Sequence, residues 1–350
     1  MNVHADFASL FVTPRDAYRW TQSRAQKWQD VDPTAISGSK FWSMPHRPGQ
    51  LAPGDLVLSL VGERGIGKTW FLRYLADHDQ RLSPLTVYLD LARRVSFSTP
   101  GDYVKEVESQ IHSQVGAGRV ILLLDSVPPQ LDEPLRALED SVLRPHLIHR
   151  SSLVIMALMH PSQVCWRAPV LRGGEFYRLR PFDEAQTQEQ VRYLQKAKLA
   201  AGDLDVQHVQ QLSGGLPLLN FLLATSGWPD AYGLLLDYWF LTIPPGDREC
   251  IQGYLEAVCL LDCLEHASMQ RSLQAYHCHK PDAVGYPAHA GGVRNMLRKY
   301  WLARPAPDAP GRIVLVDSVR HAVAQILQAE DAELYAALQK SAEEVSERRK

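Results

Sequence analysis

The octapeptide GERGIGKT, at residues 62–69, constrains this chain of 350 residues more than any other feature. It fills the pattern G-x-x-x-x-G-K-[ST] without a mismatch. Before it lies DLVLSLV (55–61), which predicts a buried strand, and after it TWFLRYLA (69–76), which predicts a helix. Glycines in such a unit let backbone N–H groups turn toward an anion, and the helix N-terminus adds partial positive charge. The segment therefore predicts a phosphate-binding loop rather than a chance glycine-rich turn.

The residue types assign roles around this loop. We expect Lys68 to bridge the terminal phosphates of a nucleotide and the Thr69 hydroxyl to hold Mg²⁺. A P-loop also needs a carboxylate at the end of a neighbouring strand, and Asp125 follows the apolar run VILLL at 120–124. Lys68 and Asp125 are thus the catalytic candidates, and Thr69 and Asp125 the metal ligands. The expected nucleotide contacts in the loop are Gly62, Glu63, Arg64, Gly65, Ile66, Gly67, Lys68, Thr69 and Trp70.

Further apolar segments predict the sheet to which this loop belongs. Strand-like stretches occur at 85–91, 151–158 and 175–182, and amphipathic helical stretches lie between the strands. Strands that alternate with helices predict a parallel sheet covered on both faces, with nucleotide at the carboxyl ends of the strands.

A second motif follows the fifth predicted strand. LSGGLPLLNFLLA (212–224) contains Gly215-Leu216-Pro217, and Asp183 is placed to cap the helix that leads toward it. With the P-loop, this order of motifs resembles the STAND branch of the AAA+-related P-loop ATPases, which includes NACHT and NB-ARC proteins, over roughly residues 50 to 328. The resemblance implies binding of ATP or ADP with Mg²⁺, and a lid in which Pro217 packs against the adenine. The alternative for the motif is a simple break between two helices.

The segment beyond the lid predicts a winged helix. Residues 247–276 indicate two helices and 291–304 a third, and a Pro/Gly-rich turn then leads into a strand. In the family that this chain resembles, a His-Asp pair before the following helix places the His on the β-phosphate of ADP. Here Asp317 is preceded by Val316, and His321 lies one turn further on. This departure weakens the expectation that ADP is locked in the usual way.

The expected fold is therefore a parallel α/β P-loop NTPase domain followed by a helical lid and a winged helix. An N-terminal segment that packs on the core (1–50) precedes the nucleotide domain (51–182). The lid (183–240), the winged helix (241–328) and a charged C-terminal helix (329–350) follow.

Two departures from the family predict slow hydrolysis. The metal-binding aspartate is commonly followed by a second acid that orients water, but Ser126 follows Asp125. A serine is no general base unaided at neutral pH. Met159 and His160 stand where an arginine commonly contacts the γ-phosphate, and a histidine gives less charge stabilisation than an arginine.

Composition sets the remaining bounds. The net charge of −2 gives no global basic field. The N-terminus has no signal peptide, and the chain has five cysteines. Both observations favour a reducing cytoplasm. Cysteines and histidines crowd between 259 and 289, but their spacing favours core cysteines, two of them on one buried helix face, over a zinc site. Arg294 and Arg298 share a face of the third winged-helix helix, where a solvated surface or a contact with the nucleotide domain is favoured over DNA.

These observations lead to one expected function and two alternatives. The main expectation is an ATP/ADP switch in signalling or defence that controls self-assembly or the activation of a separate partner protein. The first alternative is an AAA+ initiator-like ATPase that binds DNA through its winged helix. The second is a motor ATPase, which the missing catalytic acid disfavours. No membrane association is expected.

Overall fold

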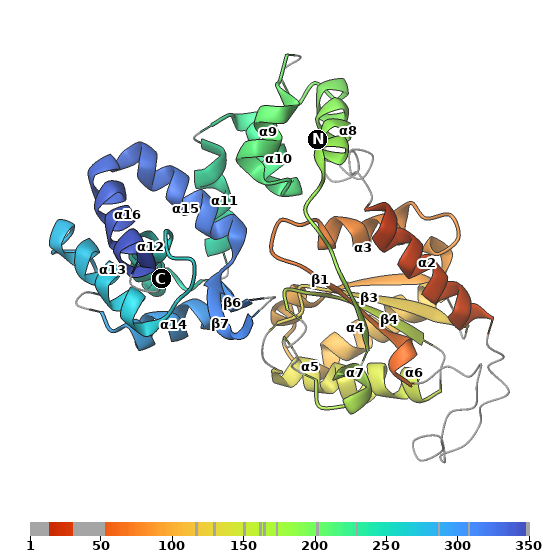
Figure 1. Cartoon of the computed structure of the whole chain (residues 1–350). Helices are drawn as coiled ribbons and strands as arrows, with labels where there is room; N and C mark the ends of the chain where they lie inside the picture. Colours follow the sequence, from red (N-terminus) through yellow and green to blue (C-terminus); the bar gives the residue numbers. More distant parts are fainter. Residues whose placement is uncertain are drawn as a thin grey trace. The chain divides into compact units, whose positions relative to one another are not determined.

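The chain divides into two compact units, Met1–Phe182 and Asp183–Lys350. Both are seen in a computed structural model of the protein (Figure 1). The described residues are 14–30, 53–115, 118–128, 131–149, 152–160, 163, 166–172, 174–200, 203–228, 230–241, 243–285, 288–306 and 309–347. Most of the segment 1–50, for which packing on the core is predicted, therefore lies outside them.

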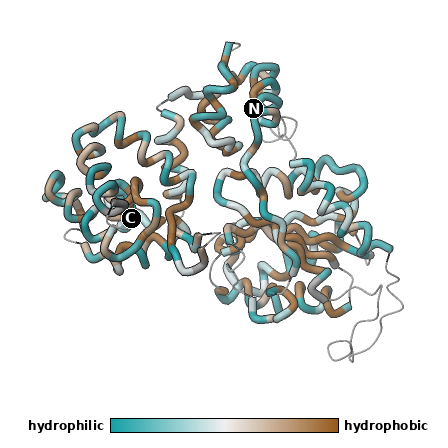
Figure 2. Tube along the Cα trace, viewed as in Figure 1, coloured by the Kyte–Doolittle hydropathy of each residue, from teal (hydrophilic) through white to brown (hydrophobic). Residues whose placement is uncertain are grey.

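A five-stranded parallel sheet forms the centre of the first unit, with strand order β2-β3-β4-β1-β5. Its strands are β1 (Val57–Val61), β2 (Thr86–Asp90), β3 (Val120–Asp125), β4 (Ser152–Leu158) and β5 (Glu175–Arg178). Every residue of β1, β3 and β4 is buried, as expected for parallel strands covered on both faces. Figure 2 shows these strands as the apolar centre of the unit.

Helices cover both faces of this sheet (Figure 1). On one face lie α2 (Arg15–Gln29) and α3 (Lys68–Asp77). On the other lie α4 (Pro100–Val115), α5 (Glu133–Leu138), α6 (Arg144–Ile148) and α7 (Pro169–Arg172). This division follows from right-handed crossovers, because the chain moves across the sheet in one direction through α3 and returns through the other helices. Short turns of helix, η4 (Pro53–Leu56), η5 (Ser83–Leu85), η6 (Leu91–Ser96) and η7 (Glu139–Leu143), complete the unit.

Helix α2 is attached to the sheet by its buried face and by polar contacts. Trp28 is buried, and the Arg119 guanidinium contacts its ring and donates to its carbonyl oxygen at 2.9 Å. Arg24 forms an ion pair of 2.7 Å with Glu175 on β5. The α2 helix thereby belongs to the first unit.

The second unit begins with four helices that make up the predicted lid: α8 (Glu184–Lys196), α9 (Val206–Ser213), α10 (Pro217–Ser226) and α11 (Asp230–Phe240). Asp183 caps α8 through a capping box with Gln186, as its position before the helix predicts. The α9 helix ends at Ser213 and is capped by Gly214, whose φ of 58° is in the left-handed region that glycine favours.

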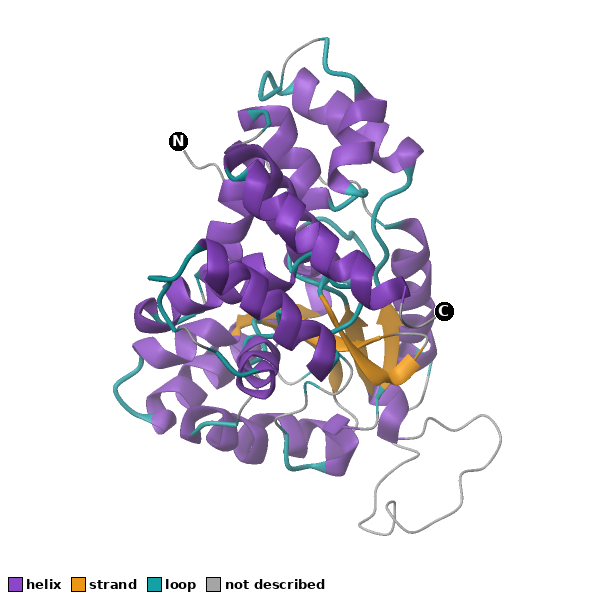
Figure 3. Ribbon diagram, turned by 60° about the vertical axis from the view of Figure 1, so that its left-hand side comes forward, coloured by secondary structure: helices purple, strands orange, loops and turns teal. Residues whose placement is uncertain are grey.

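The rest of the second unit has the winged-helix order of elements. Helices α12 (Pro245–Val258), α13 (His266–His279) and α14 (Ala290–Lys299) precede the antiparallel hairpin of β6 (Ala303–Ala306) and β7 (Ala309–Leu315). Two further helices follow, α15 (Asp317–Glu330) and α16 (Ala332–Glu347), and α16 packs on α13 and α15. Figure 3 shows that the described strands are few beside the helices and are confined to the sheet and this hairpin.

The predicted fold class is confirmed: a parallel α/β sheet with its P-loop comes first, and a helical part and a winged helix follow. Two details differ. The fifth strand ends at Arg178 rather than Phe182, because its partner β1 ends at Val61, the register partner of Arg178. Cys259 and Cys263 do not share a helix face, because α12 ends at Val258; both are nevertheless buried.

Candidate nucleotide-binding site

The loop between β1 and α3 has the backbone of a phosphate-binding loop. Gly65 and Gly67 have φ values of 82° and 94°, a region that side chains rarely adopt. Gly62 has no room for a side chain, because a Cβ there would lie 2.8 Å from Cγ2 of the buried Ile66. Thr69 and Trp70 lie in the first turn of α3. The glycines of the motif are thus required by this loop shape.

Lys68 begins α3, and its ammonium group turns back over the loop. Its Nζ donates to the carbonyl oxygens of Gly62 at 2.6 Å and Glu63 at 2.7 Å. An ammonium has three donors, so one N–H remains for a phosphate oxygen. Burial lowers the pKa of Lys68 to about 8, while the nearby charges of Asp125 and Glu63 act in the opposite direction. An anion at the loop would favour the charged form further.

Asp125 is the last residue of β3, and one strand, β4, lies between β3 and β1 in the sheet. It is 4 % exposed, and each of its carboxylate oxygens has one donor. Oδ1 accepts from the backbone N–H of Ser126 at 2.8 Å, and Oδ2 accepts from the Tyr88 hydroxyl at 2.6 Å. Each oxygen has a second lone pair, so the carboxylate can still coordinate a cation or accept from its water shell.

The donor set of this site fits a nucleotide with Mg²⁺. The loop supplies turned backbone N–H groups and one cation, and Thr69 and Asp125 supply the hard oxygen ligands that Mg²⁺ prefers. Among the described residues no group of three or more His, Cys, Asp or Glu could hold a metal by itself.

The position after Asp125 offers no acid. Ser126 is exposed and has a φ of 54°, in the left-handed region. The next acids along the chain serve other contacts. Asp132 caps α5 and forms an ion pair of 2.6 Å with Arg94, and Glu133 is the first residue of that helix.

A buried glutamine that we did not predict joins the loops after β3 and β4. Gln163 is 3 % exposed; its Oε1 accepts from the N–H of Met159 at 2.6 Å, and its Nε2 donates to the Val127 carbonyl oxygen at 2.5 Å. No motif in the sequence marks this residue. Met159 and His160 follow β4 directly, as their position predicts.

The Gly215-Leu216-Pro217 motif lies in the second unit. Pro217 is the buried first residue of α10, and its carbonyl oxygen accepts from Nε2 of Gln190 on α8 at 2.9 Å. Asn220, one turn further on, is fully buried and donates to the side-chain oxygens of Gln190 and Thr187. The motif is therefore part of a polar network that holds α8 and α10 together.

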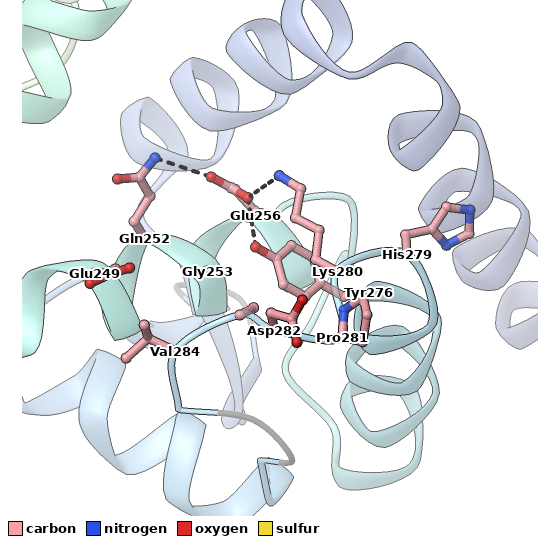
Figure 4. Close-up of a pocket in the computed structure, with 11 residues that line it drawn as sticks. Glu249, Gln252, Gly253, Glu256, Tyr276, His279, Lys280, Pro281, Asp282 and Val284 are labelled. Atoms are coloured by element: carbon pink, nitrogen blue, oxygen red, sulfur yellow. Dashed lines mark hydrogen bonds and ion pairs between the residues drawn. The ribbon is translucent and has the colours of Figure 1, made fainter.

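A separate hollow of about 570 Å³ lies between α12 and α13 (Figure 4). Several of its polar groups pair with one another: the Glu256 carboxylate accepts from Gln252, from the Tyr276 hydroxyl at 2.8 Å and from Lys280 at 3.2 Å. His279, at its edge, bonds the backbone oxygen of Ala275. The hydrogen bonds of Glu256 in this hollow thus help to hold α12 and α13 together.

Comparisons with known proteins gave only distant likenesses. No family model and no curated protein matches the chain. The RuvB Holliday junction branch migration motor of Thermotoga maritima is 15 % identical at a TM-score of 0.38, over 75 % of this chain and 86 % of that one. A structure that addresses katanin self-assembly is also 15 % identical at a TM-score of 0.38, over 54 % of this chain and 62 % of that one. None of the described helices is long and apolar enough to cross a membrane.

Proposed function

We propose that this chain is an ATP- and ADP-binding molecular switch of the STAND type, with slow hydrolysis and nucleotide-dependent assembly. The observation that carries the proposal is the meeting of Lys68, in a glycine loop of the required shape, with the buried Asp125 at the carboxyl edge of one parallel sheet. The helical part and winged helix that follow the sheet support the assignment to a switch.

In this proposal the loop and Lys68 bind the phosphates, and Thr69 and Asp125 hold Mg²⁺. Bound Mg²⁺ would neutralise phosphate charge. The preference for adenine and the contact of Pro217 with the base rest on the family resemblance. The rest of the segment from Gly62 to Trp70 would surround the phosphates, which is the role that the sequence predicts for it.

Slow hydrolysis is supported by what surrounds Asp125. An attacking water needs a base or an orienting acid, and the exposed Ser126 offers only a hydroxyl. Asp132 and Glu133 are placed at the start of α5, where Asp132 already caps the helix. We expect turnover far below the enzyme median of ~10 s⁻¹. A Ser126→Glu variant tests the missing acid directly, since its turnover rises if that absence limits the rate.

The switch itself works by population shift. ATP and ADP differ by one phosphate, and a ligand moves a conformational balance only by its differential affinity for the two forms. Contacts between chains that only the ATP form makes would add to that bias through mass action. The partner is proposed to be another copy of this chain or a separate effector protein of a cytoplasmic signalling or defence system.

Light scattering with ATP, with ADP and without nucleotide tests the proposal. Wild-type protein is expected to form larger species with ATP, whereas Lys68→Ala remains at the nucleotide-free size. Lys105→Ala is the matched control, since Lys105 is an exposed lysine on α4 of the same unit. Calorimetry that finds equal ATP affinity in wild-type and Lys68→Ala protein would remove the basis of the proposal.

A second candidate function, DNA binding through the winged helix, has one observation in its favour. The segment 290–312 has five basic residues and one acid in its sequence. Lys299 pairs with Asp247 and Arg304 with Asp317, but the described residues give no ion pair to Arg294, Arg298 or Arg312. Phosphate contacts would make duplex affinity fall steeply with salt.

A salt-titrated DNA-binding assay separates the two candidates. If the chain is initiator-like, Arg298→Ala weakens binding and reduces the salt slope by about one, and Lys340→Ala on α16 leaves both unchanged. A protein that stays monomeric with ATP and holds duplex DNA at physiological salt would favour DNA binding over the switch.

A further inference from the structure

Tyr88 lies on the same face of the sheet as Asp125. Strands β2 and β3 are parallel, and Asp90 is the register partner of Asp125. Side chains two residues apart on a strand share a face, so Tyr88 points to the side of Asp90 and Asp125. There the Tyr88 hydroxyl donates to Oδ2 of Asp125 at 2.6 Å.

The Tyr88 ring is held in place from above by α3. The guanidinium carbon of Arg73 lies 4.9 Å from the ring centroid, within the range of a cation–π contact. The ring contact with Arg73 and the hydrogen bond to Asp125 together hold the Tyr88 hydroxyl in a fixed position as a donor.

This donor completes the fixation of the Asp125 carboxylate. The Ser126 N–H holds Oδ1, and the Tyr88 hydroxyl holds Oδ2. With both oxygens engaged, the carboxylate can rotate about χ2 only by losing a charge-assisted hydrogen bond, which is stronger than one between neutral groups. Hydrogen bonds of this kind orient metal-ligating carboxylates in other sites, and their loss typically costs 10- to 100-fold in metal affinity.

We propose that Tyr88 is a positioning residue for the metal ligand Asp125, and that its hydroxyl sets the affinity of the site for Mg²⁺ with bound nucleotide. This inference rests on the proposed nucleotide function and deepens it. The Tyr88–Asp125 hydrogen bond is not needed to join β2 and β3, because the backbones of these strands already pair from Thr86–Ile121 to Asp90–Asp125.

The test is Tyr88→Phe, which removes only the hydroxyl and keeps the ring under Arg73. The matched control is Tyr103→Phe on α4, because the Tyr103 hydroxyl is also buried but has no hydrogen-bond partner among the described residues. The readout is the binding of a fluorescent ADP to the full chain, measured in EDTA and across a Mg²⁺ titration. Thermal unfolding verifies that each variant is folded.

In Tyr88→Phe we expect the Mg²⁺ concentration for half-maximal effect to rise about tenfold, the lower end of the losses found when such an orienting hydrogen bond is removed. Affinity in EDTA should stay within about twofold of wild type, and Tyr103→Phe should match wild type throughout, because neither change alters the phosphate-binding loop. An unchanged Mg²⁺ midpoint in Tyr88→Phe, or an equal loss with and without Mg²⁺, overturns the role of Tyr88 while nucleotide binding stands. Wild-type protein that binds no nucleotide overturns the proposed function as well.

Discussion

His321 on α15 donates a hydrogen bond from Nε2 to the backbone carbonyl oxygen of Leu212, at 2.8 Å. The Tyr232 hydroxyl donates to the same oxygen at 2.9 Å. A carbonyl only accepts, so this hydrogen bond requires a proton on Nε2. Leu212 lies three residues before Gly215, and this contact joins the winged-helix part to the lid within the second unit. While the bond is kept, His321 Nε2 is not available to a nucleotide phosphate.

We predict that His321→Ala lowers the free energy of unfolding by about 1 kcal/mol, the net value of one hydrogen bond. Tyr232→Phe/His321→Ala should lose more than the sum of the single changes, because Leu212 O then has neither donor. Urea unfolding of the full chain measures both. His208→Ala, on the exposed face of α9, is the control and should change little. Strictly additive losses would mean that the two donors act independently.

Nucleotide affinity should fall as pH rises above about 8, the pKa of Lys68 lowered by burial. Phosphate binding needs the ammonium form, so above this pH each binding event must take up a proton. Linkage then gives about a tenfold loss of ADP affinity per pH unit. Calorimetry of metal-free ADP from pH 7 to 9.5 measures the slope.

Lys68→Arg is the control for this pH dependence. Its guanidinium stays charged, so we expect weaker but pH-independent binding, because arginine does not reproduce the lysine geometry. If the ADP affinity of wild-type protein does not change with pH, Lys68 keeps its proton over the whole range. Burial then does not lower the pKa of Lys68 as expected.

Ser126→Gly should raise the free energy of unfolding by about 1 kcal/mol, because glycine adopts a φ of 54° without the steric cost that a Cβ brings. Ser126→Val should lower it by a comparable amount or more, since a β-branched residue suits this region least. Ser126 is exposed, so burial contributes little to either change. Denaturant unfolding is the measurement, and equal stability of the two variants would show that the turn relaxes.

Two glycines of the second unit should respond to alanine in opposite directions. A Cβ meets no atom within 4 Å at either Gly214 or Gly292, so space does not decide the outcome. Gly214 has a φ of 58°, and Gly214→Ala should cost about 1 kcal/mol. Gly292 lies in the first turn of α14, where alanine is favoured over glycine by up to about 0.8–1 kcal/mol. Thermal unfolding of both variants compares the signs; a loss at Gly292 would contradict the helical assignment.

The sequence by itself determined the sheet, the loop and the candidate residues of the site. Apolar runs specify buried parallel strands, and glycine, lysine and threonine at fixed spacing specify a phosphate loop, because these are local properties of the chain. The carboxyl ends of parallel strands share one edge, which is why the strand pattern alone associates Asp125 with Lys68. The capping residue Asp183 was also predicted from its local position, and the structure confirms it.

Only the tertiary structure decided which polar groups meet. Tyr88 and Asp125 are 37 residues apart, and His321 and Leu212 are 109 apart. These pairs depend on strand register and helix packing, which bring distant residues together without leaving a periodic signal. Gln163 is a further case. No local sequence feature distinguishes it from other loop glutamines, and its hydrogen bonds form only because β3 and β4 are neighbours in the sheet. A buried polar group must find a partner, but the partner is chosen by the completed fold rather than by its neighbours in the chain.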